Sequence, residues 1–102
     1  MNAWKINTLM NQHFPKCDFS ELALVNVEGK SDVLEAILKS NISSDDFLIS
    51  INRKVGARLS LKDAVNFIQA SMGQGQVRVS NREFTQFVVI ASNCTAAGVA
   101  SA

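Results

Sequence analysis

His13 and Cys17 are the residues whose types could make a nucleophile, because a histidine can take the proton from a nearby thiol. They are four positions apart, but Pro15 lies between them and disfavours a shared helical face. His13 is the only histidine in the chain, and no third residue is evident to orient it. We therefore expect no Cys–His catalytic site.

A second candidate is a calcium loop. Val79–Phe84 resembles the second half of an EF-hand loop, with an acid four positions after an apolar residue and an aromatic residue beside it. Calcium also needs oxygen ligands in the first half, where Met72–Val77 supplies no carboxylate.

The glycines of Gly73–Gly75 precede a possible strand rather than come after one, unlike a phosphate-binding loop. We expect no metal and no cofactor.

Charge is the remaining chemical feature. The net charge is +1, yet residues 1–50 carry four lysines and seven acids, a balance of −3, and residues 51–102 carry six cations and two acids, a balance of +4. Charged residues are most often simply solvated. If the cations of the second half meet on one face, they form a patch suited to phosphates or to an acidic protein. These candidate partner-binding residues are Arg53, Lys54, Arg58, Lys62, Arg78 and Arg82.

The absence of a DNA-binding motif narrows the kind of partner. The frame around Ala36 does not fit a helix-turn-helix, because charged or polar residues stand where apolar ones are needed: Glu35, Lys39, Asn41 and Asp46. The sequence favours a non-enzymatic protein-interaction module, such as an adaptor, a regulator or a chaperone-like protein. Its partner is another protein or a second copy of the chain. Nucleic-acid binding through the basic patch is the alternative.

Composition sets the wider limits. A chain of 102 residues with 47% hydrophobic residues fits one domain that folds by itself. Cys17 and Cys94 are too few for a disulfide scaffold and read as reduced thiols. The first residues do not read as a secretory signal, and no run of about 18 apolar residues could span a bilayer. We expect a cytoplasmic protein without a membrane contact.

The elements that would position these residues read as mainly helical: a compact bundle of five to six short helices with at most a minimal β pairing. Apolar residues at three- and four-residue spacing predict helices over 3–13, 31–41 and 60–72. A serine with an acid three positions later is a helix-start signal. It occurs at Ser43 with Asp46, Ser60 with Asp63, and Ser80 with Glu83.

Three stretches are ambiguous. Residues 45–55 and 84–91 contain strand-forming residues, but the start signals before them favour helix. Residues 19–27 fit a short helix or a strand equally well. Arg58–Asp63 is echoed twenty residues later by Arg78–Glu83, which suggests two similar helix entries forming a helical hairpin.

An α+β fold is the alternative architecture. It would use residues 22–27, 47–52, 77–80 and 84–91 as the strands of a small antiparallel sheet. In either fold the chain is one domain over residues 1–102, and residues 93–102 are interpreted as a tail that can be disordered.

Overall fold

The computed structural model describes residues 2–13, 25–91 and 95–100, which form three helices and six strands. The helices are α1 (Ala3–His13), α2 (Ser31–Asn41) and α3 (Leu61–Ser71). The strands are β1 (Val25–Asn26), β2 (Asp46–Ser50), β3 (Gly56–Ser60), β4 (Val77–Ser80), β5 (Gln86–Ile90) and β6 (Thr95–Ala100). All three helices were predicted from apolar spacing, and they are confirmed.

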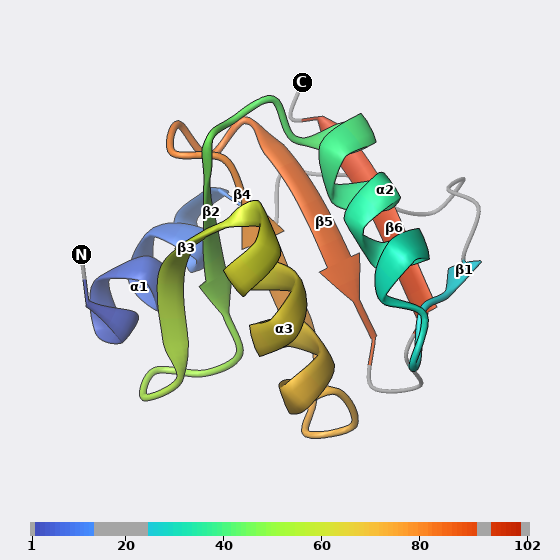
Figure 1. The fold of residues 1–102 in the computed structure, drawn as a ribbon. Helices are drawn as coiled ribbons and strands as arrows, with labels where there is room; N and C mark the ends of the chain where they lie inside the picture. The colour runs from blue at the N-terminus through green and yellow to red at the C-terminus, as the bar shows by residue number, and fades with distance from the viewer. Residues whose placement is uncertain (1, 14–24, 92–94, 101–102) are drawn as a thin grey trace.

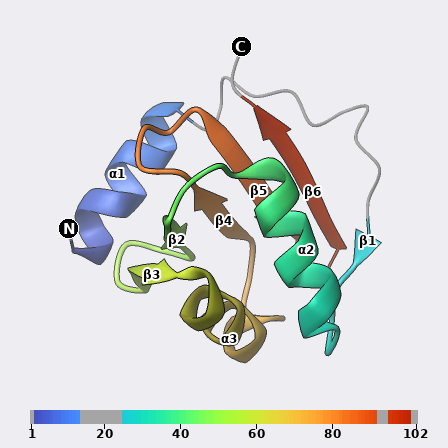
Figure 2. The same ribbon diagram turned by 45° about the horizontal axis from the view of Figure 1, so that its top comes forward.

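All six strands join one antiparallel sheet in the order β1-β6-β5-β4-β2-β3. Helices α2 and α3 lie on one face of this sheet, and α1 crosses the other face (Figure 1). The turned view in Figure 2 shows the same three layers, with α1 apart from the α2–α3 pair. The strands β3 and β1 therefore form the two edges of the sheet.

The prediction of a mainly helical bundle of five to six helices is wrong, because the protein has an α+β fold. Residues 46–50 and 86–90, expected to be helical, are the strands β2 and β5. Helices cover both faces of the sheet, so neighbours such as Leu48 and Ile49, or Phe87 and Val88, are all buried. A strand buried on both faces reads as a continuous apolar run, and its period of two is hidden in the sequence.

The helix-start signal at Ser80 is also misread. Ser80 is the last residue of β4, fully buried, and its Oγ donates to the carbonyl of Asn81 at 2.8 Å. Ser43 begins no helix either: it lies between α2 and β2, and its acid partner Asp46 is the first residue of β2. Only Ser60 begins a helix, where it is the N-cap of α3 and donates from its Oγ to Asp63 Oδ2 at 3.3 Å. A serine and an acid three residues apart thus occur before a strand and at a strand end as well as at a helix start.

The predicted helical hairpin is replaced by a sheet. Each copy of the repeated stretch starts as a strand, since β3 ends at Ser60 and β4 ends at Ser80. The two strands lie on either side of β2 and pair with it rather than with each other. The chain enters α3 directly after Ser60 and a tight turn to β5 directly after Ser80.

Two further stretches, residues 93–102 and 19–27, can be compared with their predictions. Residues 95–100, interpreted as part of a tail, form β6, which pairs with β5 along its length. Within 19–27, Val25 and Asn26 form a short strand beside β6. Residues 19–24 lie outside the described part of the chain, as do Cys17 and Cys94.

The core has two parts, one on each face of the sheet. Between the sheet and α2–α3 lie buried side chains that include Leu34, Leu38, Ile49, Ile68 and Val79. Between the sheet and α1 lie Ile6, Met10, Leu48, Phe84 and Phe87. Each fully buried side chain of this size contributes about 1.5–3 kcal/mol to stability. Both layers of helices therefore contribute to the stability of the sheet.

Candidate interaction surface

The six cations predicted to form one patch lie on four different parts of the fold. Arg53 and Lys54 are in the turn between β2 and β3, and Arg58 is in β3 itself. Arg82 is in the β4–β5 turn, at the opposite end of the sheet from the β2–β3 turn, because β2 and β4 are antiparallel neighbours. The structure therefore brings together three of the six, Arg53, Lys54 and Arg58, on one hairpin.

Arg78 has a structural position beneath α1. Its guanidinium donates to Asn11 Oδ1 at 2.7 Å and to Asn7 Oδ1 at 3.0 Å, and Ser50 Oγ donates to the same Asn7 oxygen at 3.2 Å. Burial lowers the pKa of Arg78 from its ordinary value, because the charged form loses solvation. Arg78 thus joins α1 to the sheet and is not part of an open basic surface.

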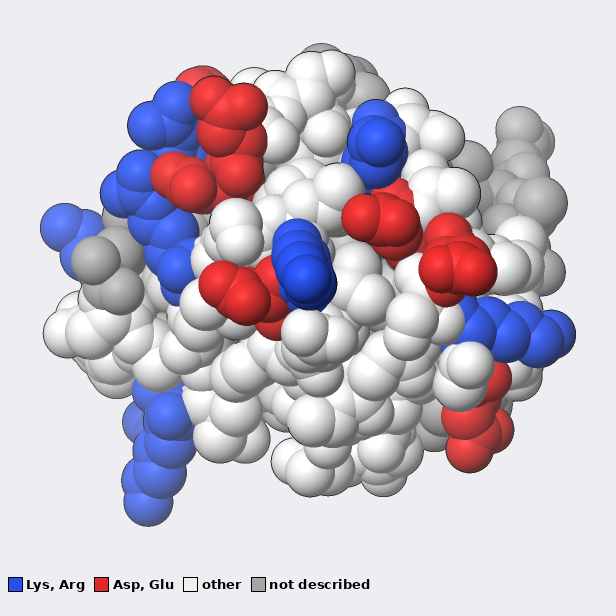
Figure 3. Space-filling model, viewed as in Figure 1, with Lys and Arg blue, Asp and Glu red and all other residues white. Residues whose placement is uncertain are grey.

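Lys62 lies on the other face, in the first turn of α3. It lines a shallow depression of about 290 Å³ together with Asp32 and Glu35 of α2, whose charges offset its own. Figure 3 shows the face that carries α2 and α3, where the lysine and arginine side chains lie in separate groups interspersed with acids. This face offers no continuous basic patch.

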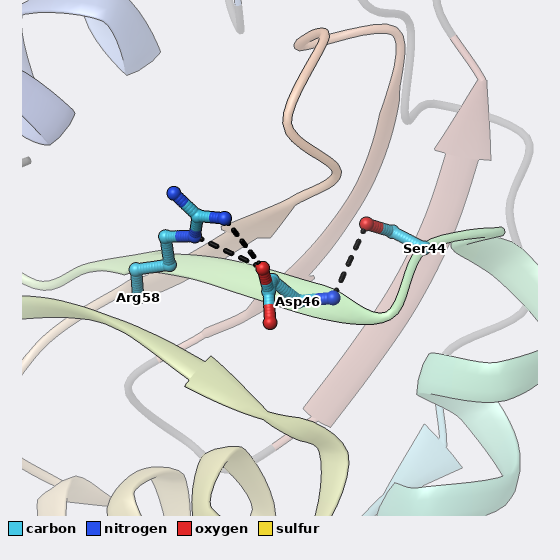
Figure 4. A network of polar contacts seen from close by, with 3 residues as sticks. All are labelled: Ser44, Asp46 and Arg58. Atoms are coloured by element: carbon cyan, nitrogen blue, oxygen red, sulfur yellow. Dashed lines mark hydrogen bonds and ion pairs between the residues drawn. The ribbon is translucent and has the colours of Figure 1, made fainter.

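Arg58 is held by an ion pair with Asp46 across the β2–β3 hairpin. Its Nη2 and Nε both donate to Asp46 Oδ2, at 2.6 and 3.0 Å, and the Asp46 amide donates to Ser44 Oγ at 3.4 Å (Figure 4). Both side chains are partly exposed, 45% for Arg58 and 32% for Asp46, so the pair adds little stability. In Figure 4 the third guanidinium nitrogen, Nη1, has no bonded partner among the residues drawn. Donors therefore remain for a second carboxylate.

The outer edge of β3 has backbone groups without a strand partner in the described part of the chain. Ile51 donates its N–H to the carbonyl of Val55. This bond identifies the residues of the hairpin that exchange hydrogen bonds across the strand pair. In an antiparallel pair, every second residue of a strand bonds to its neighbour. From Val55 onward, Ala57 and Leu59 therefore bond to β2, and the N–H and C=O of Gly56 and Arg58 point away from it. No described strand pairs on that side.

The turn that leads into β3 is fixed by hydrogen bonds and by close packing. In the turn, Asn52 Oδ1 accepts hydrogen bonds from the amides of Lys54 and Val55, at 2.8 and 2.9 Å. At the start of β3, a Cβ on Gly56 would lie 2.7 Å from the carbonyl oxygen of Ile49, so only glycine fits there without a shift. The exposed Arg53 and Lys54 are therefore presented on a fixed backbone rather than on a loose loop.

An exposed tryptophan lies near the same end. Trp4 is 60% exposed. Its neighbour Ala3 packs against β3, with its Cα 3.6 Å from the Cβ position of Gly56. Tryptophan and arginine are the residue types most enriched where protein partners bind tightly. We define the β3 edge surface as Trp4, Arg53, Lys54 and the strand Gly56–Ser60.

The other sequence candidates have structural roles. His13 stacks on Phe84, with ring centroids 5.5 Å apart and planes at 21°. Phe84 is buried and has a positive φ of 56°, unusual for a residue with a side chain, in the β4–β5 turn. The side chain of Asn81 holds this turn through bonds to Thr85 and Gln86. The stretch that resembled a calcium loop is thus a hairpin turn.

An apolar depression of about 400 Å³ lies on the outer side of α2, lined by Val25, Asp32, Val33, Ala36, Ile37, Ser40 and Asn41. Val33, one of its apolar lining residues, is 36% exposed. The depression has no cluster of polar groups converging on it and therefore suggests no chemistry.

Among the described residues, no three His, Cys, Asp or Glu side chains are close enough together to hold a metal ion. No helix within those same ranges is long and apolar enough to cross a membrane. Comparisons with protein-family models, with curated proteins and with solved structures find no match to this chain.

Proposed function

We propose that this protein is a non-enzymatic interaction module that binds another polypeptide by accepting one of its segments as an added strand beside β3. The observation that carries the proposal is the open edge of β3, where the N–H and C=O of Gly56 and Arg58 face away from the sheet. An extended segment can pair with such an edge through main-chain hydrogen bonds, and side chains on either side then give specificity.

The form of the edge supports this use. Natural proteins protect open edges with very short strands, proline, bulges or charged residues. Of these devices, β3 has only the charge of Arg58: it runs for five residues, contains no proline and pairs without interruption along β2. The competing explanation is that Arg58 serves only to prevent unwanted pairing, in which case no peptide should bind at this edge.

The non-enzymatic part of the proposal rests on the surroundings of the candidate nucleophiles and bases. His13, the best general base by type, stacks on Phe84 at the end of α1. Ser80 is fully buried and bonded to the Asn81 carbonyl, so it cannot meet a substrate without unfolding of the turn. A nucleophile needs both access to its substrate and a base within hydrogen-bond reach, and a buried serine that donates to a carbonyl lacks the first.

Nucleic-acid binding is less well supported, because phosphate contacts need several cations facing one backbone. Arg78 lies beneath α1, Lys62 lies beside acids, and Arg58 pairs with Asp46. Of the six candidate cations, Arg53 and Lys54 are the two that remain together on the hairpin turn. Binding to oligonucleotides that weakens steeply between low and high salt would favour this rival.

The proposal is tested by selecting binders from a library of random linear peptides displayed on phage. Selected peptides should bind the wild-type protein, should keep binding to Arg58→Val with at most the loss of a guanidinium contact, and should lose binding to Arg58→Pro. Both variants lack the guanidinium, but only proline removes the outward N–H, which the pairing with β2 does not use. Melting temperatures of both variants control for misfolding. Failure to select any peptide, or equal binding to both variants, would contradict strand addition at β3.

A further inference from the structure

We infer that the segment added to β3 belongs to a partner protein and is acidic, with acidic and apolar side chains in alternation, and that it runs antiparallel to β3, as every neighbouring pair of strands in this sheet does. This inference rests on the proposed function and specifies its partner. It depends on the charges of the hairpin, on the two environments on either side of the edge, and on the unsuitability of a second copy.

The charge of the hairpin selects for acids. Between residues 46 and 60, the chain contains three cations, Arg53, Lys54 and Arg58, and Asp46 as the single acid. Asp46 is already bonded to Arg58 through one oxygen. The hairpin therefore keeps a positive surplus, carried by Arg53 and Lys54 in the turn that leads into β3. Opposite charges across paired strands stabilise the pairing, while like charges oppose it.

The two sides of the edge differ. Arg58 is paired with Leu48, which belongs to the core beneath α1, so the Arg58 side chain is on the α1 face. A partner residue directly opposite Arg58 shares that face. An acid at that position can accept from Nη1 without displacing Asp46, because Arg58 uses Nη2 and Nε for Asp46.

The positions between the acids face the other side. Leu59 packs against the core beneath α2 and α3, and Ala57 pairs with Ile49 of the same core. Both are half-buried, so their outer surfaces remain available beside the edge. A partner residue opposite either one is on this apolar side. The best match to β3 is thus a segment that alternates acids with residues such as valine.

A second copy of the chain fits poorly. If two β3 strands paired antiparallel about a two-fold axis at Arg58, the two arginines would lie directly opposite each other. The Arg53–Lys54 turns of the two copies would lie at opposite ends of the joined strands, so the two Arg58 side chains are the like charges brought face to face. Like charges directly opposite destabilise a strand pair, and the edge therefore disfavours its own copy.

The test uses the full chain and four labelled peptides measured by fluorescence anisotropy. The first peptide is Glu-Val-Glu-Val-Glu-Val-Glu, and the second replaces every Glu with Lys. The third carries N-methyl groups on its Glu amides and the fourth on its Val amides. In antiparallel pairing the residue opposite Arg58 exchanges hydrogen bonds with it, so the Glu amides face β3 and the Val amides face away.

We expect the Glu–Val peptide to bind more tightly than its Lys counterpart by at least about tenfold, and to weaken as salt rises. Replacing Arg53 and Lys54 with serine should weaken it by several-fold. Methylation of the Glu amides should abolish binding, and methylation of the Val amides should leave it nearly unchanged. The last comparison involves no protein variant and so does not depend on whether a variant folds.

The outcomes distinguish a failure of the acidic-partner inference from a failure of the proposed strand addition at β3. If the library yields neutral or basic peptides that still need the N–H at position 58, the acidic partner is wrong and strand addition stands. If the Lys peptide binds as well as the Glu peptide, the acidic partner is wrong for the same reason. If methylation of the Glu amides has no effect, antiparallel pairing at this edge is wrong. If neither peptide nor library gives binding, the proposed function itself fails.

Discussion

The β4–β5 turn offers the sharpest test of the fold, through Asn81→Ala. The Asn81 side chain is only 4% exposed. Its Oδ1 accepts from the amides of Thr85 and Gln86, at 2.9 and 3.2 Å, and its Nδ2 donates to Thr85 Oγ1 and Gln86 Oε1, at 2.8 and 3.4 Å. Gln86 Oε1 also accepts from the Ser43 amide at 2.7 Å, so this network joins the turn to the segment before β2.

The expected loss can be estimated from these bonds. A hydrogen bond contributes about 0.5–1.5 kcal/mol net, and more when a partner is left buried and unsatisfied. The bond at 3.4 Å is the weakest of the four, so Asn81→Ala should lower the free energy of unfolding by about 2–4 kcal/mol. For a domain of this size, the melting temperature should fall by about 10–30 °C.

Asn52→Ala is the matched control. Asn52 also accepts from two backbone amides of a hairpin turn, those of Lys54 and Val55, but it is exposed and water can replace its bonds. Its replacement should reduce the free energy of unfolding by less than about 1 kcal/mol. Urea denaturation measured by circular dichroism gives both values. Equal losses in the two variants would refute the argument that burial makes the Asn81 network important.

Three further predictions concern packing and charge. Phe87→Ala removes a fully buried ring and should reduce the free energy of unfolding by about 3–5 kcal/mol in the same urea assay. Gly56→Ala places a Cβ 2.7 Å from the Ile49 carbonyl and should destabilise by about 1–3 kcal/mol; a neutral result would mean that the hairpin relaxes easily. A double-mutant cycle of Arg58→Val and Asp46→Ala should give a coupling below about 1 kcal/mol that shrinks in high salt, and a larger, salt-independent value would contradict the exposed pair.

Helices were predictable from the sequence where one face alone is buried. In α3, Ala64, Val65 and Ile68 are buried and recur at helical spacing, while Lys62 and Asp63 are exposed. This contrast between faces is what a single sequence shows well. The strands β2 and β5 have no such contrast, because α1 covers one face of the sheet and α2 and α3 cover the other.

The candidate surface was predictable only in part. Arg53, Lys54 and Arg58 were identified by charge, and they do share one hairpin. Arg78 was grouped with them as a cation of the second half of the chain, but it lies under α1 and bonds to Asn7 and Asn11. The open edge itself has no signal in residue types, since it depends on which strand ends the sheet.

The sheet order also explains why the repeat was misinterpreted. Both copies place a serine at the end of a strand, and the residues after that serine determine the next element of the fold. After Ser60 the chain has Leu61 and the helix-forming residues of α3. After Ser80 the buried Asn81 closes a turn, and Phe84 adopts a positive φ. Local patterns cannot distinguish these cases, because the choice is made by contacts with distant parts of the chain.

Amide hydrogen exchange along β3, measured by NMR on the free protein and again with the Glu–Val peptide, tests the central claim most directly. In the free protein, the amides of Ala57 and Leu59 should exchange slowly, because they bond to β2. Those of Gly56 and Arg58 should exchange fast, because they face outward. The peptide should slow the exchange of Gly56 and Arg58 and leave Ala57 and Leu59 nearly unchanged. Slow exchange at Arg58 in the free protein, or no change on adding the peptide, would contradict an open edge that accepts an acidic strand.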